Sequence, residues 1–308
     1  MLNDYKKKPD KRMSLKEAVS TFMFDGCSVG FSGMGGAQVV APVHEIIRQN
    51  IKDLTLMGDS PVEPGDLLTG MGLVKKMEIG WEAYALAGQA PNFRRSVEKS
   101  IPLKVEVEEY SNFTMGLRYL AQAMNVPYLP TRSLRGSDIP KYNSNIIETV
   151  DPYTNSPIAL VPAANPDVCF VHANRADILG NAQFIGFSAN GENLARAAKH
   201  CVITCEEIVT TDVIRSTGNL TIIPQYVVDA VVEVPYCCHP WNCPYAYAYD
   251  IVSHLDQLKT FKTREGFLQW IDEWVLGVPD HNGYLKKVGF EKLNELTRVE
   301  KKFCNAPY

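Results

Sequence analysis

Residues 27–40 read CSVGFSGMGGAQVV, and this stretch decides the fold. The apolar residues 27–31 predict a buried strand, and the glycine-rich residues 32–38 predict a loop directly after it. Pro42 suits the first turn of a helix, which is expected over 43–50. A loop in this place lies at the carboxyl end of its strand, where open parallel sheets bind ligands. The stretch therefore predicts a ligand-binding loop in a parallel sheet.

The rest of the chain repeats this alternation of strands and helices. A capping box at Ser14 and Glu17 predicts a helix to about residue 24. Near-continuous apolar strands separated by helices predict an α/β fold, with three layers (α/β/α), a mostly parallel open sheet and further helices at the C-terminus. Further strands are expected at 53–58, within 73–81, and at 103–110, 157–163, 167–173, 200–206 and 227–235, and helices at 93–99, 111–124, 192–200 and 263–299.

The pattern divides the chain into three regions. Residues 1–13 are rich in lysine and predict a flexible N-terminal tail. Residues 14–260 are expected to form the α/β domain, within which residues 127–157 are rich in Pro, Ser, Arg and Asn and predict a loop. Residues 261–308 are expected to form a helical extension with one apolar face, made by Phe267, Trp270, Ile271 and Trp274.

Composition excludes several classes of protein. The chain has 308 residues, 45% of them hydrophobic, which is ample for a buried core. Its net charge of −4 argues against nucleic-acid binding. No apolar run reaches the ~18 residues that cross a bilayer, and the N-terminus does not resemble a signal peptide. We therefore expect a cytoplasmic protein that neither spans a membrane nor binds nucleic acid.

The cysteines are the candidate metal ligands. The chain has eight, and in a large cytoplasmic protein they are expected to be reduced. Cys237, Cys238, His239 and Cys243 lie close together in the sequence, as metal ligands often do. Zinc sites usually need a second pair of ligands at a similar spacing, which this segment lacks. No metal site is predicted.

The glycine-rich loop does not match a dinucleotide-binding fingerprint. That fingerprint requires G-x-G-x-x-G, and from Gly33 its last position is occupied by Gln38. The next acidic residue at a suitable distance, Asp53, begins a strand rather than ending one. NAD binding is therefore not expected. Two interpretations remain: a loop that only turns tightly, and a loop whose amides cradle a thioester carbonyl or part of coenzyme A (CoA).

Several charged residues lie near expected strand ends. Glu108 and Glu109 end a strand just before a helix that begins near Ser111. Two interpretations remain for this pair: one carboxylate acts as a nucleophile or base, or both are solvated or cap the helix. Arginines at 94–95, 132 and 135 suit phosphates or carboxylates, and equally suit surface salt bridges. His172 ends a strand and is interpreted as a structural histidine. No nucleophile elbow of the type G-x-S-x-G is present.

Six ordered segments carry a resemblance to a known family. They include VGFSGM at 29–34 and VHANRADILGN at 171–181, and the others are 109–112, 126–130, 204–209 and 228–232. Together they resemble the A (alpha) subunit of family I CoA-transferases, most closely the glutaconate branch, over roughly residues 14–300. The resemblance implies a CoA-transferase fold, a B-subunit partner and an α2β2 assembly. It implies no permanently bound cofactor, with a CoA thioester as substrate.

The resemblance also implies a mechanism. A glutamate forms an anhydride with the acyl group and then a glutamyl–CoA thioester, which passes CoA to an acceptor acid. In two-chain members this glutamate lies in an S-E-N-G motif of the B subunit, and the present chain has no such motif. This chain is expected to line the site and to stabilise the oxyanion. The residues expected to contact substrate or CoA are Ser32, Gly33, Met34, Gly35, Gly36, Glu82, Ser111, Asn112 and Arg132.

Two alternatives remain open. Relatives of this fold act as ring-opening hydrolases or decarboxylases on CoA thioesters, and in that case Glu109 is the candidate catalytic carboxylate. A non-enzymatic module that senses acyl-CoA or sugar phosphates is the third interpretation. Residues 82–88 are more apolar than the matching stretch of the glutaconate enzyme, and Cys237–Cys238 replaces its usual Gly-Ala before His-Pro. Both differences argue against a glutaconate-like dicarboxylate substrate.

Overall fold

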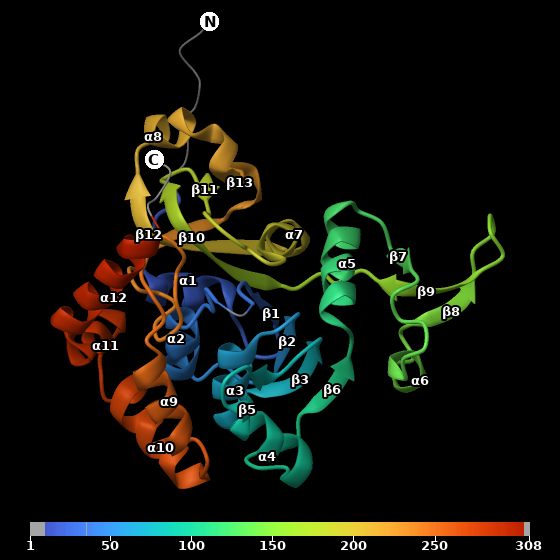
Figure 1. The fold of residues 1–308 in the computed structure, drawn as a ribbon, viewed down its shortest axis with the longest axis horizontal. Coiled ribbons are helices and arrows are strands. Elements are labelled where there is room, and N and C mark those ends of the chain that lie inside the picture. The colour runs from blue at the N-terminus through green and yellow to red at the C-terminus, as the bar shows by residue number, and fades with distance from the viewer. Residues whose placement is uncertain (1–9, 35, 305–308) are drawn as a thin grey trace, which may run out of the picture.

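A nine-stranded sheet forms the centre of the protein among the residues that the computed structural model describes, which are 10–34 and 36–304 (Figure 1). The strands β14–β12–β10–β1–β2–β3–β6 are parallel neighbours in this order, and β11 and β13 add an antiparallel edge to β10. This confirms the predicted α/β fold with a mostly parallel sheet. The strands are β1 (Ser28–Phe31), β2 (Leu54–Gly58), β3 (Val74–Ile79), β6 (Glu106–Glu109), β10 (Val168–Asp177), β11 (Ala182–Gln183), β12 (His200–Val209), β13 (Thr221–Ile223) and β14 (Ala230–Glu233).

Helices cover both faces of the sheet because its strands are apolar on both sides. Successive side chains of a strand point to opposite faces. On β10, Val168 and Phe170 therefore belong to one core cluster, whereas Cys169 and Val171 belong to the other. The first cluster lies under α1 (Leu15–Phe22), α2 (Ala41–Gln49), α3 (Val62–Gly70), α9 (Ile251–Thr260) and α10 (Arg264–Ile271), and the second under α5 (Asn112–Ala123) and α7 (Gly191–Ala197).

The remaining elements lie at the edges of these layers. A small hairpin joins β4 (Ala83–Tyr84) to β5 (Gly88–Gln89) and leads into α4 (Pro91–Lys99). The other helices are α8 (Thr211–Ser216), η1 (Gly218–Leu220), η2 (Gln225–Val227), the π-helix η3 (Asp272–Leu276), α11 (His281–Val288) and α12 (Phe290–Phe303). Helix α3 is not predicted from the sequence, because its Pro64 and Gly65 are typical of turns.

The strand order reverses between β1 and β10. From β1 the chain adds β2, β3 and β6 on one side of the sheet, and from β10 it adds β12 and β14 on the other. At such a switch point the connecting segments diverge and leave a crevice at the carboxyl ends of the strands. The glycine-rich loop after β1 lies at this point.

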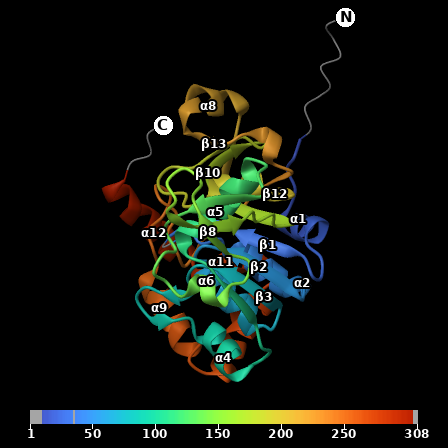
Figure 2. The ribbon, with the colours of Figure 1, turned by 90° about the vertical axis from the view of Figure 1, so that its right-hand side faces the viewer.

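Residues 127–162 form a projecting arm rather than the predicted loop (Figures 1 and 2). The arm is a separate antiparallel sheet in the order β7–β9–β8, with one short helix. Its elements are β7 (Tyr128–Thr131), α6 (Ile139–Tyr142), β8 (Ile147–Val150) and β9 (Pro157–Pro162). The strand expected at 157–163 is therefore present, but it does not join the main sheet. Figure 2 looks at the molecule from the side of the arm.

The N-terminal end of the described chain and the first C-terminal helices lie against the α/β body. The amide of Met13 donates to the carbonyl of Val231, and Lys11 Nζ donates to the carbonyls of Gln225 and Val228, each at 2.6 Å. The described part of the expected tail is thus bonded to the sheet edge, while residues 1–9 lie outside the described residues. Phe267, Trp270 and Ile271 are buried in the main core, with Trp274 packed against it. Within the described residues, none of the helices has the length and apolar character needed to cross a bilayer.

Candidate active site at the carboxyl edge of the sheet

The glycine loop (residues 32–38) connects the two halves of the sheet at the switch point. The Ser32 amide donates to the carbonyl of Phe170 at 3.0 Å, and the Ser32 hydroxyl accepts the amide of His172 at 3.0 Å. Ser32 is buried, so its side chain positions the loop against β10 rather than facing a ligand. Of the predicted loop residues, Gly35 lies outside the described residues.

Gly33 is required by the geometry of this turn. Its φ of +106° lies in a region that side-chain-bearing residues rarely adopt, and a Cβ there would be 2.3 Å from the carbonyl oxygen of Ala37. Gln38 closes the turn, because its side-chain amide donates to the carbonyls of Gly33 and Ser60, each at 2.9 Å. The amides of Gly33 and Met34 bond to no residue that the structure describes.

A pocket of about 580 Å³ lies beside this loop, and we call it the central pocket. Met34 lines it from the glycine loop, Asn112 from the start of α5, and the β4–β5 hairpin contributes a further wall. Its walls are mainly apolar, and its described lining residues include no Asp, Glu, Lys or Arg. They are Met34, Ser60, Val62, Trp81, Ala83, Tyr84, Ala85, Leu86, Ala87, Asn112, Trp241, Asn242, Tyr249, Leu255 and Leu258.

The polar groups of the pocket converge near Met34. Asn112 Nδ2 contacts Ser60 Oγ at 3.4 Å and Met34 Sδ at 3.6 Å, while its buried Oδ1 has no hydrogen-bond partner among the described residues. Gly80 makes room for this side chain, since a Cβ there would be 2.5 Å from Asn112 Oδ1. A buried unpaired acceptor costs about 1–3 kcal/mol, which a ligand donor can offset. Asn112 is thus a predicted site residue that the structure places in the pocket.

Three carboxyl groups lie behind the aromatic wall of the pocket. Glu63 accepts hydrogen bonds from His254 at 2.9 Å and from Trp241 at 3.3 Å. Burial raises the pKa of Asp66 to about 7, against the opposing effect of bonds from Phe93 and Asn92. Burial, and then the nearby Asp66 and Glu63, raise the pKa of Glu82 well above its ordinary value. Both Glu82 oxygens are buried without a partner among the described residues, so the neutral acid is favoured there.

The other predicted site residues lie away from the pocket lining. Glu82 is buried among the carboxyls, and the hydroxyl of Ser111 caps α5 by accepting the amide of Thr114 at 3.1 Å. Arg132 lies in the arm, 60% exposed, and pairs with Asp151 at 3.4 Å. Glu109 is exposed at the end of β6. Gly36 borders the pocket residue Asn242, because a Cβ on it would lie 2.8 Å from Asn242 Oδ1.

A second hollow of about 690 Å³ adjoins the central pocket and shares its Tyr84, Leu86 and Leu258 walls. Its rim carries more cationic than anionic side chains. The charged residues are Arg94, Arg95, Lys99, Lys259 and Lys262, with Glu98 as the one described acidic member. Arg94 pairs with Glu98 at 2.8 Å, and Arg95 bonds the carbonyl of Phe261, so both arginines also have structural partners.

Sequence reasoning missed several residues of this edge. Asn190 Nδ2 donates to Asp59 Oδ2 at 2.9 Å, which ties α7 to the end of β2. Trp241 and Asn242 lie in the segment that follows β14. Asp59 and Ser60 directly follow the strand predicted at 53–58. They could therefore have been found from the rule that ligands bind at the carboxyl ends of parallel strands. The contacts of Asn190, Trp241 and Asn242 are long-range, and no local pattern signals them.

These features define an α/β protein with a candidate ligand site at the switch point of its sheet, made of an apolar pocket and loop amides that lack a described partner. The family model for coenzyme A transferase matches residues 12–234. The chain belongs to this family.

Named relatives agree with this assignment. The chain is similar to the A component of the 3-oxoadipate CoA-transferase of Pseudomonas knackmussii, with 35% identity over 90% of this chain and 97% of that protein. The crystal structure of the glutaconate CoA-transferase of Acidaminococcus fermentans matches with a TM-score of 0.85 and 30% identity, covering 93% of this chain and 95% of that chain. A more distant relative is a cholesterol ring-cleaving hydrolase component of Rhodococcus jostii, 27% identical over 92% of this chain and 99% of that protein.

Proposed function

We propose that this chain is the A (alpha) subunit of a heteromeric CoA-transferase that moves CoA between an acyl-CoA and a carboxylic acid. One observation carries the proposal: two amides of the glycine loop, those of Gly33 and Met34, are without a described partner beside a pocket whose described lining has no carboxylate. Amides in this position stabilise an oxyanion, and the nucleophile comes from a partner chain. CoA thioester is the substrate, and no cofactor is bound permanently.

The proposed chemistry proceeds through two covalent states. A glutamate of the partner chain attacks the thioester carbonyl and expels CoA as its thiolate, which leaves an acyl–glutamyl anhydride. The thiolate then attacks the glutamyl carbonyl, releases the acyl group as a carboxylate and forms a glutamyl–CoA thioester. An acceptor carboxylate reverses these steps. The Gly33 and Met34 amides bond the negative oxygen of each tetrahedral intermediate.

Assembly and location follow from the same proposal. The 3-oxoadipate and glutaconate relatives are themselves A components of CoA-transferases, which supports a B-subunit partner for this chain. We expect an α2β2 tetramer in the cytoplasm. The cationic rim of the adjoining hollow suits the phosphates of CoA.

A trapping experiment tests the reaction. The chain is co-expressed with a B-type CoA-transferase subunit, incubated with acyl-CoA and then treated with borohydride. Reduction of one B-chain glutamate, together with CoA transfer that depends on an acceptor acid, is the expected result. An unmodified B chain with acceptor-independent release of free CoA would overturn the proposal.

The ring-opening or decarboxylating alternative is tested at Glu109. This carboxylate is exposed at the end of β6 and does not line the central pocket. The Glu109→Ala variant of the A/B pair is therefore expected to keep its transfer activity within about threefold, a change of less than about 1 kcal/mol in the barrier. Glu106→Ala, on the same strand and also exposed, is the matched control. Loss of activity in Glu109→Ala alone would favour the hydrolase or decarboxylase.

The lining of the central pocket supports the proposal that the acyl group is apolar and carries no second carboxylate. Glutaconate and 3-oxoadipate, the acids in the names of the two relatives, each carry two carboxylates. Here the wall is formed by Trp81, Tyr84 and Trp241, with the Glu63 carboxylate directly behind Trp241. A buried second carboxylate would meet no cation among the described lining residues and would be repelled by Glu63.

A substrate panel and one variant test this preference. The A/B pair is assayed with phenylacetyl-CoA and hexanoyl-CoA against glutaryl-CoA, and the apolar thioesters are expected to have a kcat/KM at least about 100-fold higher. Leu86→Arg puts a cation at the mouth of the pocket and is expected to narrow this ratio, whereas Leu86→Met is the control that keeps it. An equal kcat/KM for glutaryl-CoA in the unmodified pair would contradict the proposed preference for an apolar acyl group. The proposal of CoA transfer would still stand.

A further inference from the structure

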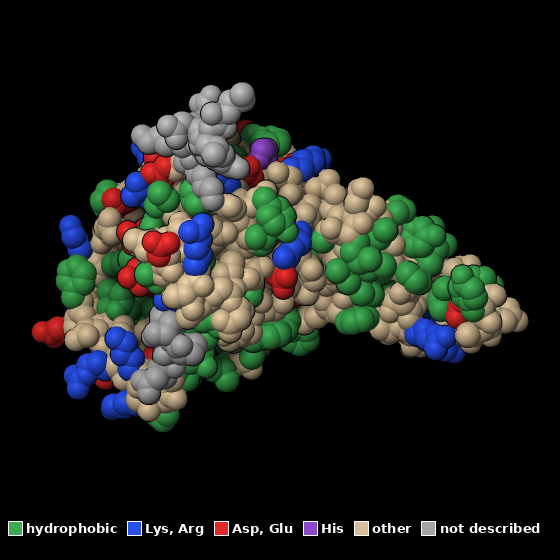
Figure 3. Space-filling model, turned by 90° about the horizontal axis from the view of Figure 1, so that it is seen from above, with side chains coloured by type: hydrophobic (Ala, Val, Ile, Leu, Met, Phe, Trp, Pro, Cys, Tyr) green, Lys and Arg blue, Asp and Glu red, His purple; other side chains and the backbone are tan. Residues whose placement is uncertain are grey.

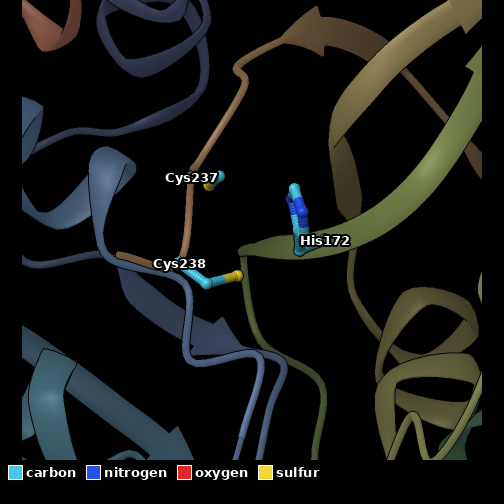
Figure 4. Close-up of side chains that lie close together, drawn as sticks. All are labelled: His172, Cys237 and Cys238. Atoms are coloured by element: carbon cyan, nitrogen blue, oxygen red, sulfur yellow. The ribbon is translucent and has the colours of Figure 1, made fainter. Parts of the chain in front are cut away.

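Three buried side chains outside the central pocket converge on one point (Figure 4). His172 belongs to β10, whereas Cys237 and Cys238 lie in the segment after β14. Their ligand atoms all lie within 4.8 Å of one another, and none of the three is more than 2% exposed. In Figure 4 the two cysteines lie on one side of a small space and the His172 ring on the other. The sequence predicted a structural histidine and no metal site, because it gave no sign that β10 meets this segment.

A second group of ligands overlaps the first at His172. Glu206 and Cys243 form with His172 another set whose ligand atoms lie within 4.8 Å of one another. His172 Nε2 is 2.9 Å from Glu206 Oε1, yet the contact lacks hydrogen-bond geometry, and Nε2 has no hydrogen-bond partner among the described residues. A fully buried nitrogen that lies among sulfur and oxygen atoms, contacts a carboxylate only as an ion pair and makes no hydrogen bond is unusual. It is the type of atom that a metal ion satisfies.

The donor set and its dimensions fit zinc. Thiolates and imidazole favour zinc over magnesium or calcium, which prefer oxygen ligands. With Zn–S near 2.3 Å and Zn–N near 2.0–2.1 Å, the ligands of a tetrahedral site lie roughly 3.3–3.8 Å apart. The ligand atoms lie within 4.8 Å of one another, so a contraction of at most about 1 Å brings them to these distances, and cysteine rotamer changes can supply it. Full burial is typical of structural zinc sites, which have no open position for substrate.

We propose that His172, Cys237 and Cys238 bind a structural zinc ion, and that Cys243 or Glu206, the two other residues whose ligand atoms lie close to His172, moves in as the fourth ligand. The ion would hold the segment after β14 against the glycine loop. The carbonyl of Cys237 accepts the amides of Val40 and Ala41 at 3.2 and 3.0 Å, at the start of α2. In the same segment, the carbonyl of Asn242 accepts the amide of Ala37 at 2.9 Å. Zinc at the cysteines would thus fix both anchors of the glycine loop.

Metal analysis of the full-length chain tests this site directly. The protein is purified under reducing conditions with zinc present, and its metal content is measured by mass spectrometry. About one zinc ion per chain is expected, falling below about one tenth in the Cys237→Ser/Cys238→Ser double variant. Cys27→Ser, the same change at a cysteine that is also fully buried, is the control and is expected to keep its zinc. Zinc content that is negligible in the unmodified chain, or equal in the double variant, would overturn the proposal.

Cobalt substitution keeps the test decisive if the double variant does not fold. The unmodified chain loaded with Co²⁺ is expected to show sulfur-to-cobalt charge-transfer absorption and a tetrahedral d–d spectrum. A spectrum with one thiolate fewer in Cys243→Ser would identify Cys243 as the fourth ligand, and an unchanged spectrum would exclude Cys243 and leave Glu206 as the candidate. A cobalt spectrum without thiolate bands, or six rather than eight titratable thiols in the denatured chain, would exclude zinc bound by the cysteine pair.

Discussion

At the residue scale, Gly33 is the position where a single methyl group has the largest expected effect. Gly33→Ala would place a Cβ 2.3 Å from the Ala37 carbonyl oxygen at a φ of +106°. We expect the loop to shift, with a loss of about 2–3 kcal/mol in stability and at least about 100-fold in kcat/KM, because the oxyanion amides move with it. The measurement is transfer activity of the A/B pair beside its thermal unfolding.

Gly26→Ala provides the matched control. Its φ is +85°, but a Cβ there would meet nothing within 4 Å. Only the backbone strain of about 1–2 kcal/mol remains, and activity is expected to be unchanged. If both variants lose activity equally, the steric argument for Gly33 is wrong.

Asp66 is expected to make stability depend on pH. Burial raises its pKa to about 7, whereas a free Asp titrates near 3.8. The folded state therefore binds more protons than the unfolded state between these values, and stability falls as pH rises from about 4 to 7. The full effect is about 4 kcal/mol, because each pH unit between the two pKa values contributes about 1.4 kcal/mol. In urea unfolding across pH 4–8, the free energy of unfolding of Asp66→Asn is expected to fall less with rising pH than that of the unmodified chain.

The control for Asp66 is Asp212→Asn, whose carboxylate is 91% exposed. Its pH profile should match that of the unmodified chain. Identical profiles for Asp66→Asn and the unmodified chain would mean that Asp66 ionises normally in the folded state.

Individual residues were predictable where their role is local. The capping box at Ser14–Glu17 and the cap at Ser111 are confirmed, because each depends on residues three positions apart. Asn112 could be placed at the site because a helix start after a strand end fixes its position. Arg132 could not, since its loop folds into an arm that lies away from the pocket. His172 and Cys237 meet only through the tertiary fold.

At the scale of elements, α5 is the junction between sheet and arm. Arg118 on α5 pairs with Glu78 of β3 at 2.7 Å, and its guanidinium lies 4.0 Å from the centre of the Tyr110 ring. Arg118 Nε also donates to the carbonyl of Pro162 at the end of β9, at 3.2 Å. One side chain therefore contacts a strand of the main sheet, a residue before α5 and the last strand of the arm.

Removing this side chain should destabilise the protein. Arg118→Met leaves the buried Glu78 with only Lys76 as its cationic partner among the described residues, and we expect a loss of about 3 kcal/mol in the free energy of unfolding. Arg215→Met is the control, because both members of its ion pair are exposed and its loss should be below about 1 kcal/mol. Guanidinium unfolding curves measure both. Similar losses in the two variants would refute the junction role of Arg118.

Elements were predictable where one signal dominated. Strands β1, β2 and β10 are apolar runs of strand length, and their predicted positions agree with the structure. The predicted strand at 167–173 ended too early, because β10 continues through Arg175 and Asp177, polar residues buried by contacts from β11 and its neighbours. Of the arm strands, β9 was predicted, whereas β7 and β8 were missed because they are only four residues long and lie in a segment whose Pro, Ser, Arg and Asn content is typical of a loop.

At the scale of the whole molecule, the arm exposes large apolar side chains. Tyr142 is 83% exposed, Tyr153 95% and Ile147 59%. Figure 3 shows hydrophobic side chains gathered over this projecting end of the molecule. A small sheet without a second layer cannot bury these groups by itself, and exposed apolar surface of this kind marks interaction sites.

We expect the B subunit to cover the arm. A Tyr142→Asp/Tyr153→Asp double variant should reduce co-purification of the B chain at least about tenfold, because charges enter an apolar contact. Tyr226→Asp is the control, since Tyr226 is 77% exposed but lies in η2, outside the arm. Size-exclusion chromatography of the co-expressed pair measures the change. Full assembly of the double variant would place the B subunit elsewhere.

The pairing of β1 with β10 also delays completion of the sheet during synthesis. Val29 lies beside Val168, so one edge of β1 has no partner until 139 further residues have been made. At a ribosomal rate of about 5–20 residues per second, that wait lasts roughly 7–30 s. Throughout it, an apolar strand presents free backbone donors and acceptors to any other nascent chain. The same topology that creates the binding crevice thus makes the newly emerging N-terminal half dependent on protection, and additional chaperone should raise the yield of soluble protein.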